Sequence, residues 1–298
     1  MRTLYGRSAL AVTDLTAPLL VLPDDRADGR LPGAVALSEV AVTVRRWASL
    51  GIRGVKLFAF GHERDGRASG ALAPGNRMLA GIDAVKAADP GMAVTTEVCG
   101  CAWTSHGRCV LLHDGGIDLS GTYELMAAMA VQHAEAGADA VSPTAMLDGS
   151  VRAVRTALDA AGWRDVGVNP AIALHTVLYG PFKGLMGTDP RSGHRRGLQL
   201  EPGRADRDAL TQARRWVEEG ADSLTLQPVM TAMDVLVRLA GGRTPLTAYS
   251  VSGEWDVLRH LSPSGVVEYH TAIKRAGADV ILSFAAEQVA RLLGDAHG

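Results

Sequence analysis

The feature that constrains this chain most is a regular alternation of short apolar runs with helix-like segments. The tripeptide Gly-Ala-Asp begins at Gly137, Gly220 and Gly277, each time after a helix-like segment and before an apolar, β-branched run. Glycine suits the left-handed position at which a helix ends, so each copy predicts a helix that turns directly into a strand. With this register, eight apolar runs can be counted, at residues 18–22, 54–60, 93–100, 140–146, 165–174, 223–230, 246–253 and 280–287.

Eight alternating strand and helix units with nearly continuous apolar strands predict a closed parallel barrel, the (β/α)8 or TIM-barrel fold of the α/β class. An open, doubly wound sheet is the alternative, but no Gly-x-Gly-x-x-Gly motif follows the first run. Since no linker or shift in composition divides the chain, we expect a short N-terminal tail at residues 1–17 and one barrel domain at residues 18–298. Active sites of such barrels lie at the C-terminal ends of the strands, so functional residues are expected late in each run or just after it.

Composition excludes several classes of function. The net charge of −2 gives no electrostatic reason to expect a nucleic acid or an anionic membrane as partner. No apolar run is long enough to cross a bilayer, and the N-terminus lacks the pattern of a signal peptide. We therefore expect a cytoplasmic protein.

The cysteines of the chain are confined to one short segment. Cys99, Cys101 and Cys109 lie within eleven residues, at the end of the third run and in the loop after it. Alternate residues of a strand face the same side, so Cys99 and Cys101 can converge on one ion, to which the glycine-containing loop can return Cys109. Three thiolates favour zinc and leave one tetrahedral position open, which is typical of catalytic zinc sites. The alternatives are unrelated buried thiols and a redox trio, although the Cys-x-x-Cys spacing is missing.

Six segments carry a resemblance to a known family. Their sequences are Leu-Pro-Gly (31–33), Thr-Ser-His-Gly-Arg-Cys (104–109), Val-Ser-Pro-Thr-Ala-Met-Leu-Asp-Gly (141–149), Tyr-Gly-Pro-Phe (179–182), Tyr-Ser-Val-Ser-Gly-Glu (249–254) and Lys-Arg-Ala-Gly-Ala-Asp (274–279). In this order, and with the two upstream cysteines, they resemble porphobilinogen synthase (5-aminolaevulinate dehydratase). The resemblance implies a TIM barrel that depends on zinc or magnesium and condenses two 5-aminolaevulinate molecules to a pyrrole. It also implies a homo-oligomer, a dimer or larger.

The chain departs from that family at the positions of its two Schiff-base lysines. The resemblance places them at Ala173, six residues before Tyr179, and at Gln227, just before Pro228. Neither side chain has a nucleophilic amine, so no imine can form there. Lys183 stands where the family has a carboxylate-binding arginine, and it acts either as a charged anchor or as a replacement imine former.

The resemblance assigns further residues to the binding of a small-molecule carboxylate. Lys183, Arg195 and Gln199 are expected to hold one carboxylate beside the metal, and Ser252 to bind a carboxylate on the other side. Gln227 is expected to contact the substrate from the end of the sixth run. The alternative for Lys183, Arg195 and Gln199 is a solvated cationic loop.

Three residues are candidates for proton transfer. His175 lies two residues after Ala173, so on a continuing strand it would point the same way, as a general base, a fourth metal ligand or a packing residue. Glu97 replaces a family aspartate two residues before Cys99. Asp148 is kept from the family motif, and its alternative role is that of a turn or cap residue.

Together these features predict a zinc-dependent lyase or condensing enzyme with altered chemistry. We expect it to act on a small amino- or keto-acid, in specialised metabolism rather than in haem synthesis. One alternative is a non-catalytic, zinc-bound scaffold or regulatory homologue. Porphobilinogen synthesis without imines is another.

Overall fold

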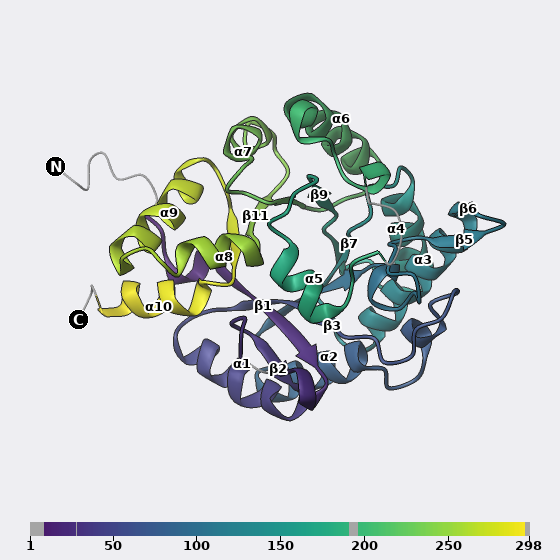
Figure 1. Ribbon diagram of the computed structural model, residues 1–298, viewed down its shortest axis with the longest axis horizontal. Coiled ribbons are helices and arrows are strands. Elements are labelled where there is room, and N and C mark those ends of the chain that lie inside the picture. The colour runs from purple at the N-terminus through teal and green to yellow at the C-terminus, as the bar shows by residue number, and fades with distance from the viewer. Residues whose placement is uncertain (1–8, 28, 191–195, 296–298) are drawn as a thin grey trace.

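The computed structural model describes residues 9–27, 29–190 and 196–295 and arranges them as strands surrounded by helices (Figure 1). The main sheet is parallel, in the order β8-β7-β4-β3-β1-β12-β11-β10-β9, with β2 added beside β1. A separate antiparallel hairpin, β5–β6, projects from the side of the molecule (Figure 1). The strands are β1 (Leu15–Leu22), β2 (Ala34–Ala36), β3 (Gly54–Ala59), β4 (Ala93–Val98), β5 (Leu111–His113), β6 (Gly116–Asp118), β7 (Ala140–Pro143), β8 (Gly167–Val168), β9 (Ala171–Ala173), β10 (Leu224–Gln227), β11 (Leu246–Ser250) and β12 (Val280–Ser283).

The strands at the two ends of that order, β8 and β9, are two segments of one barrel strand. β8 pairs with β7 and β9 pairs with β10, and only Asn169 and Pro170 separate them. The Asn169 amide donates to the Val141 carbonyl at 2.8 Å, whereas the Pro170 carbonyl accepts from the Thr225 amide at 2.9 Å. The strand thus changes partner at a residue that has no N–H of its own. When β8 and β9 are counted as one strand, the sheet closes into an eight-stranded barrel, and the predicted TIM-barrel fold is confirmed.

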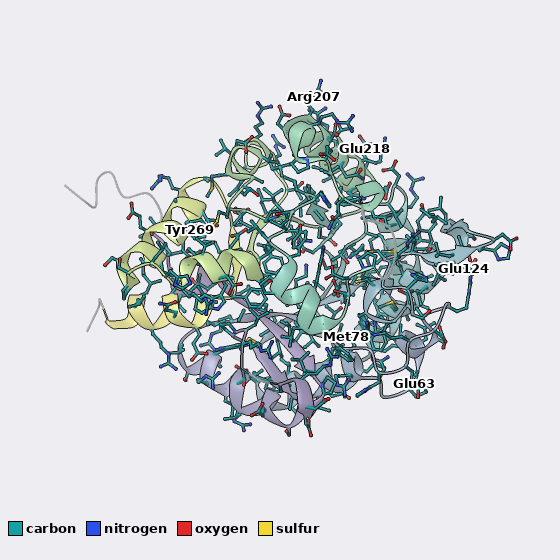
Figure 2. All side chains as sticks on the ribbon, in the orientation of Figure 1. Glu63, Met78, Glu124, Arg207, Glu218 and Tyr269 are labelled. Carbon is teal, nitrogen blue, oxygen red and sulfur yellow. The ribbon has the colours of Figure 1, made fainter. Side chains whose placement is uncertain are left out.

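The helices cover the outside of the barrel. On α6, Arg207 and Glu218 point into solvent (Figure 2), while Ala209, Ala213 and Trp216 are buried against the strands. This is the pattern of an amphipathic helix on a core. No helix in the described ranges has the length and apolar character needed to cross a bilayer. The helices are α1 (Val40–Ser49), α2 (Arg77–Ala88), α3 (Leu119–Glu135), α4 (Ser150–Ala160), α5 (Gly180–Met186), α6 (Ala205–Glu218), α7 (Met233–Leu239), α8 (Ser252–Leu258), α9 (Pro263–Arg275) and α10 (Ala286–Asp295).

The barrel begins earlier than the sequence predicts. A short turn at Val12–Asp14 leads into β1, whose first residue is Leu15 rather than Pro18. Leu15 pairs with Ile281 of β12, and Thr16 pairs with Gly54 of β3. Residues 15–17, which the sequence analysis assigned to the tail, are therefore part of the first barrel strand, β1.

Two short helices, α5 and α8, pack against each other after the ends of β9 and β11. The Gly253 amide donates to the Leu178 carbonyl at 2.7 Å, and a Cβ at Gly253 would lie 2.5 Å from that oxygen. Only glycine permits this approach. The Phe182 amide donates to Ser252 Oγ at 2.9 Å, which joins the two helix starts. The contact places Lys183 and Ser252 at the mouth of the barrel.

Candidate active site

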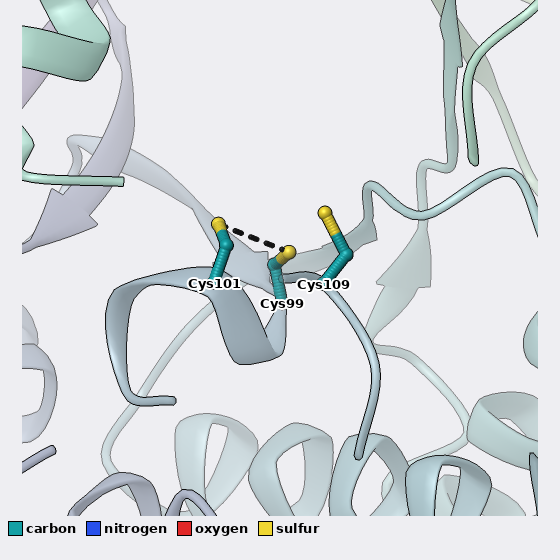
Figure 3. Close-up of side chains that lie close together, drawn as sticks. All are labelled: Cys99, Cys101 and Cys109. Atoms are coloured by element: carbon teal, nitrogen blue, oxygen red, sulfur yellow. Dashed lines mark hydrogen bonds between the residues drawn. The ribbon is translucent and has the colours of Figure 1, made fainter. Parts of the chain in front are cut away.

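The three cysteines lie together at the C-terminal end of β4. Cys99 follows the strand directly, Cys101 lies in a 3-10 turn (Gly100–Ala102), and Cys109 lies in the loop beyond. All three are buried, and their Sγ atoms lie within 4.8 Å of one another, with 3.2 Å between those of Cys99 and Cys101 (Figure 3). The sulfurs converge as the spacing predicts, but for a different reason. The strand ends at Val98, so the turn, not strand alternation, aims Cys101.

Local hydrogen bonds fix the loop that returns Cys109. Thr104 Oγ1 donates to the Arg108 carbonyl at 2.9 Å, and the Arg108 amide donates to His106 Nδ1 at 3.1 Å. A Cβ at Gly100 would lie 3.1 Å from the Cys109 carbonyl oxygen, so glycine lets the two segments approach closely. The position of Cys109 is therefore built into the loop.

The cysteine cluster fits a metal ion. Tetrahedral zinc with Zn–S bonds of about 2.3 Å holds its sulfurs about 3.8 Å apart, which lies between the 3.2 Å from Cys99 to Cys101 and the 4.8 Å within which all three sulfurs lie. Hydrogen bonds with Cys101 and Cys109, together with burial, raise the pKa of Cys99 well above its usual range. A buried set of thiols becomes a set of thiolates readily only when a cation compensates the charge.

The cysteines form one side of a pocket at the barrel mouth. Aromatic side chains form much of another side, and the Phe58 and Phe182 rings meet edge to face with centroids 5.0 Å apart. The pocket therefore combines an apolar wall with a few polar groups, as small-molecule sites do. It is lined by Phe58, Glu97, Cys99, Cys101, Cys109, Thr144, Ala173, Tyr179, Phe182, Lys183, Thr188, Leu198, Gln199, Gln227, Tyr249, Val251 and Ser252.

Ala173 and Gln227 lie side by side in that pocket. They are paired in register at the ends of β9 and β10, and the Tyr179 hydroxyl donates to the Gln227 carbonyl at 3.1 Å. The positions that the resemblance assigns to the two lysines thus face the pocket without an amine. Among the described residues that line the pocket, Lys183 alone is a lysine. Its Nζ lies 3.7 Å from Asp189 Oδ1.

Other predicted substrate residues also reach the pocket. Glu97, Gln199 and Ser252 line it. Thr144 Oγ1 makes a long contact of 3.5 Å with Glu97 Oε1. Arg195 lies outside the described residues.

His175 reaches the pocket only through a neighbour. It is absent from the lining, and its Nδ1 lies 3.1 Å from Oε1 of Gln199. β9 ends at Ala173, and the His175 amide donates to the Leu200 carbonyl at 2.8 Å. Leu174 between them still pairs with Leu200, but His175 contacts Gln199 and is not part of the pocket lining as Ala173 is.

Asp148 lies away from the pocket. Its side chain is 59% exposed and forms an ion pair with Arg215 on α6. Its carbonyl accepts a hydrogen bond of 2.6 Å from the Tyr123 hydroxyl. These contacts are those of a residue that ties the loop before α4 to neighbouring helices.

Sequence reasoning missed two features of the site. One is the aromatic wall, in which the Phe58 and Tyr249 rings stack with centroids 6.4 Å apart. The other is Lys56, a buried lysine whose Nζ donates to Ser142 Oγ at 2.8 Å. Both had a signal in the sequence, because Lys56 interrupts an otherwise apolar strand and Phe58 follows it on the same face.

The family model and the relatives that match nearly the whole chain in sequence share one name. The family model for delta-aminolevulinic acid dehydratase matches residues 1–292. The delta-aminolevulinic acid dehydratase of Halalkalibacterium halodurans is 34% identical, and the match covers 99% of this chain and 94% of that protein. The Escherichia coli protein of the same name is 33% identical, with 97% and 93% covered.

A solved structure agrees with these relatives. It is delta-aminolevulinic acid dehydratase (porphobilinogen synthase) of Toxoplasma gondii in complex with the reaction product porphobilinogen. The TM-score is 0.92 at 26% identity, over 100% of this chain and 90% of that one.

These relatives overturn one prediction made from the sequence. Altered chemistry in specialised metabolism was expected because both Schiff-base lysines are missing. Relatives that align over nearly their full length are instead named for the haem-pathway enzyme, so that prediction is wrong. The chain belongs to the delta-aminolevulinic acid dehydratase family.

Proposed function

We propose that this chain is a metal-dependent lyase that condenses 5-aminolaevulinate to porphobilinogen, as part of haem synthesis. The observation that carries the proposal is the pocket in which three clustered cysteines share one cavity with Lys183, Gln199 and Ser252. The names of the full-length relatives support the same reaction. With it we propose a cytoplasmic homo-oligomer, as the family resemblance implies.

Zinc is the ion that we propose for Cys99, Cys101 and Cys109. Thiolates favour soft or borderline cations, and magnesium prefers oxygen ligands. When bound, zinc with an open position supplies Lewis-acid polarisation of a carbonyl oxygen or of a water molecule.

The remaining polar groups are suited to a carboxylate. Ser252 Oγ accepts the Phe182 amide, so its own hydroxyl proton is available to donate to a ligand. Gln199 Oε1 can only accept, so His175 Nδ1 donates to it in the tautomer that forms this bond, and the Gln199 amide group remains for a ligand. Lys183 adds the positive charge. We propose that these three side chains bind the substrate carboxylate.

Catalysis at this site has to proceed without lysines at residues 173 and 227. Gln227 has an amide nitrogen that donates hydrogen bonds but forms no imine, and we propose that it contacts the substrate carbonyl oxygen. We propose Lys183 as a cationic anchor rather than an imine former. Treatment with borohydride in the presence of 5-aminolaevulinate should then leave the protein mass unchanged, and a substrate adduct on Lys183 would show that it forms the imine.

The test of the function is a pyrrole assay. The purified protein is incubated with 5-aminolaevulinate, with zinc or with a chelator, and porphobilinogen is measured with dimethylaminobenzaldehyde. We expect pyrrole formation that the chelator abolishes and zinc restores. Binding of 5-aminolaevulinate by zinc-loaded protein without any pyrrole would contradict the proposal.

A further inference from the structure

A buried lysine lies below the pocket. Lys56 on β3 is 3% exposed, and its Nζ donates to Ser142 Oγ, which is fully buried on β7. Lys56 is not part of the pocket lining, although Phe58, two residues later on the same face, is. Any influence of Lys56 on a ligand must therefore pass through a neighbour.

Glu97 is that neighbour. β4 lies between β3 and β7, and its Glu97 is paired in register with Ser142, the hydrogen-bond partner of Lys56. Burial lowers the pKa of Lys56 to about 8, and the nearby Glu97 carboxylate opposes that shift. Lys56 is thus mainly an ammonium at neutral pH. An ammonium this deeply buried is tolerated when an opposite charge and a hydrogen-bond partner accompany it.

Glu97 links this buried charge to the pocket. Among the described residues that line the pocket, Glu97 is the single carboxylate and Lys183 the single lysine. A ligand with a carboxylate at one end and an ammonium at the other would complement these two charges.

We propose that Lys56 is a positioning residue that holds the Glu97 carboxylate at the pocket, where Glu97 binds the amino group of an aminocarboxylate substrate. This rests on the proposed function, which supplies a substrate with both groups. Lys56 acts here through the position it gives to Glu97. Ser142 has a supporting role, since its hydroxyl accepts a hydrogen bond from the ammonium.

Two unreactive ligands test the inference. 5-Aminopentanoate has a carboxylate and an amine at the ends of a five-carbon chain but lacks the ketone, and pentanoate lacks the amine as well. Their dissociation constants are measured by calorimetry on the zinc-loaded, full-length protein. We expect the wild-type protein to prefer 5-aminopentanoate by about tenfold or more, the strength of one charge-assisted hydrogen bond.

The variants are Glu97→Gln, Lys56→Met and the two combined. We expect each single variant to lose most of the preference, and the double variant to lose no more than Glu97→Gln alone, because both act through one carboxylate. Lys86→Met is the matched control. It removes a lysine that pairs with Asp139 at 2.7 Å on the outside of the barrel and should keep the full preference.

Three results would overturn the inference. They are a wild-type protein without preference for the amine, a folded Lys56→Met that keeps it, and a double variant whose loss equals the sum of the single losses. Thermal unfolding establishes that Lys56→Met is folded, which we expect because methionine fills the space without a buried charge. If it does not fold, Ser142→Ala decides, with a smaller loss of preference expected and an unchanged preference overturning the inference. The ligands do not react, so a protein that forms no pyrrole but keeps the coupled preference separates this inference from the proposed function.

Discussion

The two sides of the pocket differ in how much they keep of the family's chemistry. On the β4 side, Cys99, Cys101 and Cys109 form a complete three-sulfur cluster. On the β9–β10 side, Ala173 and Gln227 stand where the resemblance places two lysines. Both sides belong to the same barrel fold, so the fold by itself does not indicate which side keeps its functional groups.

The difference has a structural basis. The cysteine cluster depends on a turn and a loop held by hydrogen bonds. Its proposed metal site needs all three sulfurs in place at once. Ala173 and Gln227 lie on regular parallel strands, where the backbone pairing is independent of the side chain. Such positions can lose a functional group without any change in the barrel. Metal binding on the β4 side should therefore be sensitive to single substitutions. On the β9–β10 side, substitution by lysine should restore the missing amines.

The largest effect is expected from breaking the β4 side. Cys109→Ser should lower zinc affinity more than 100-fold and abolish zinc-dependent pyrrole formation, because loss of a mere partner of a metal ligand already lowers affinity about 10- to 100-fold. Metal content after dialysis and the pyrrole assay measure both effects. Ser105→Ala, in the same loop but outside the pocket lining, is the control. Full zinc retention by Cys109→Ser would show that the three sulfurs do not act as one site.

The next largest effect is a gain of activity, expected on the β9–β10 side. Lysines introduced together as Ala173→Lys and Gln227→Lys should raise the rate of pyrrole formation by at least about tenfold, because they restore the amines that form imines. The pocket wall should also desolvate them, which lowers a lysine pKa and frees the amine. Borohydride trapping followed by peptide mass analysis measures imine formation at each position. A double variant that folds but traps no substrate would mean that the β9–β10 side has lost more than its two lysines.

A smaller effect is expected at the carboxylate anchor. Lys183→Met should raise the KM for 5-aminolaevulinate by about tenfold with little change in kcat, the loss expected for one charge-assisted contact. Lys183→Arg should restore KM, since an arginine binds a carboxylate at least as well. Steady-state kinetics of the two variants checks this. Loss of kcat in both, with KM unchanged, would instead indicate that the Lys183 amine reacts.

The barrel fold and the cysteine cluster could be predicted from the sequence, because both depend on regular spacing of residues. The alternation of apolar runs and helices predicted the barrel, and the spacing Cys-x-Cys-x7-Cys predicted the cluster of three sulfurs. The surroundings of His175 could not be predicted from such a pattern. His175 was expected to point the same way as Ala173, but it lies outside the pocket lining and its Nδ1 contacts Gln199 Oε1. That partner is 24 residues away in the sequence, so no local pattern indicates the contact.

Lys56 was missed for a different reason. Its partner Ser142 is 86 residues away, on a strand that is separated from β3 by β4, and the order of the strands in the sheet brings the two together. The function was mispredicted because two missing lysines outweighed a match that spans nearly the whole chain.

The smallest effect concerns the support behind β4. His133 of α3 is 1% exposed, its Nδ1 lies 2.9 Å from Thr96 Oγ1 on β4, and burial lowers its pKa to about 3. The His133 imidazole of the unfolded chain therefore binds a proton near pH 6.5, whereas that of the folded chain stays neutral. The contribution of neutral His133 to the free energy of unfolding is fully present above pH 6.5 and decreases as the pH falls toward 3. The slope for one proton approaches about 1.4 kcal/mol per pH unit. His133→Gln should be less stable at pH 7.5 but should lose less on acidification. Urea unfolding of both proteins between pH 7.5 and 5 measures this, and parallel decline would rule out His133 as the source. Because Thr96 lies three residues before Cys99, zinc retention measured over the same range shows whether the β4 side loosens along with the barrel wall behind it.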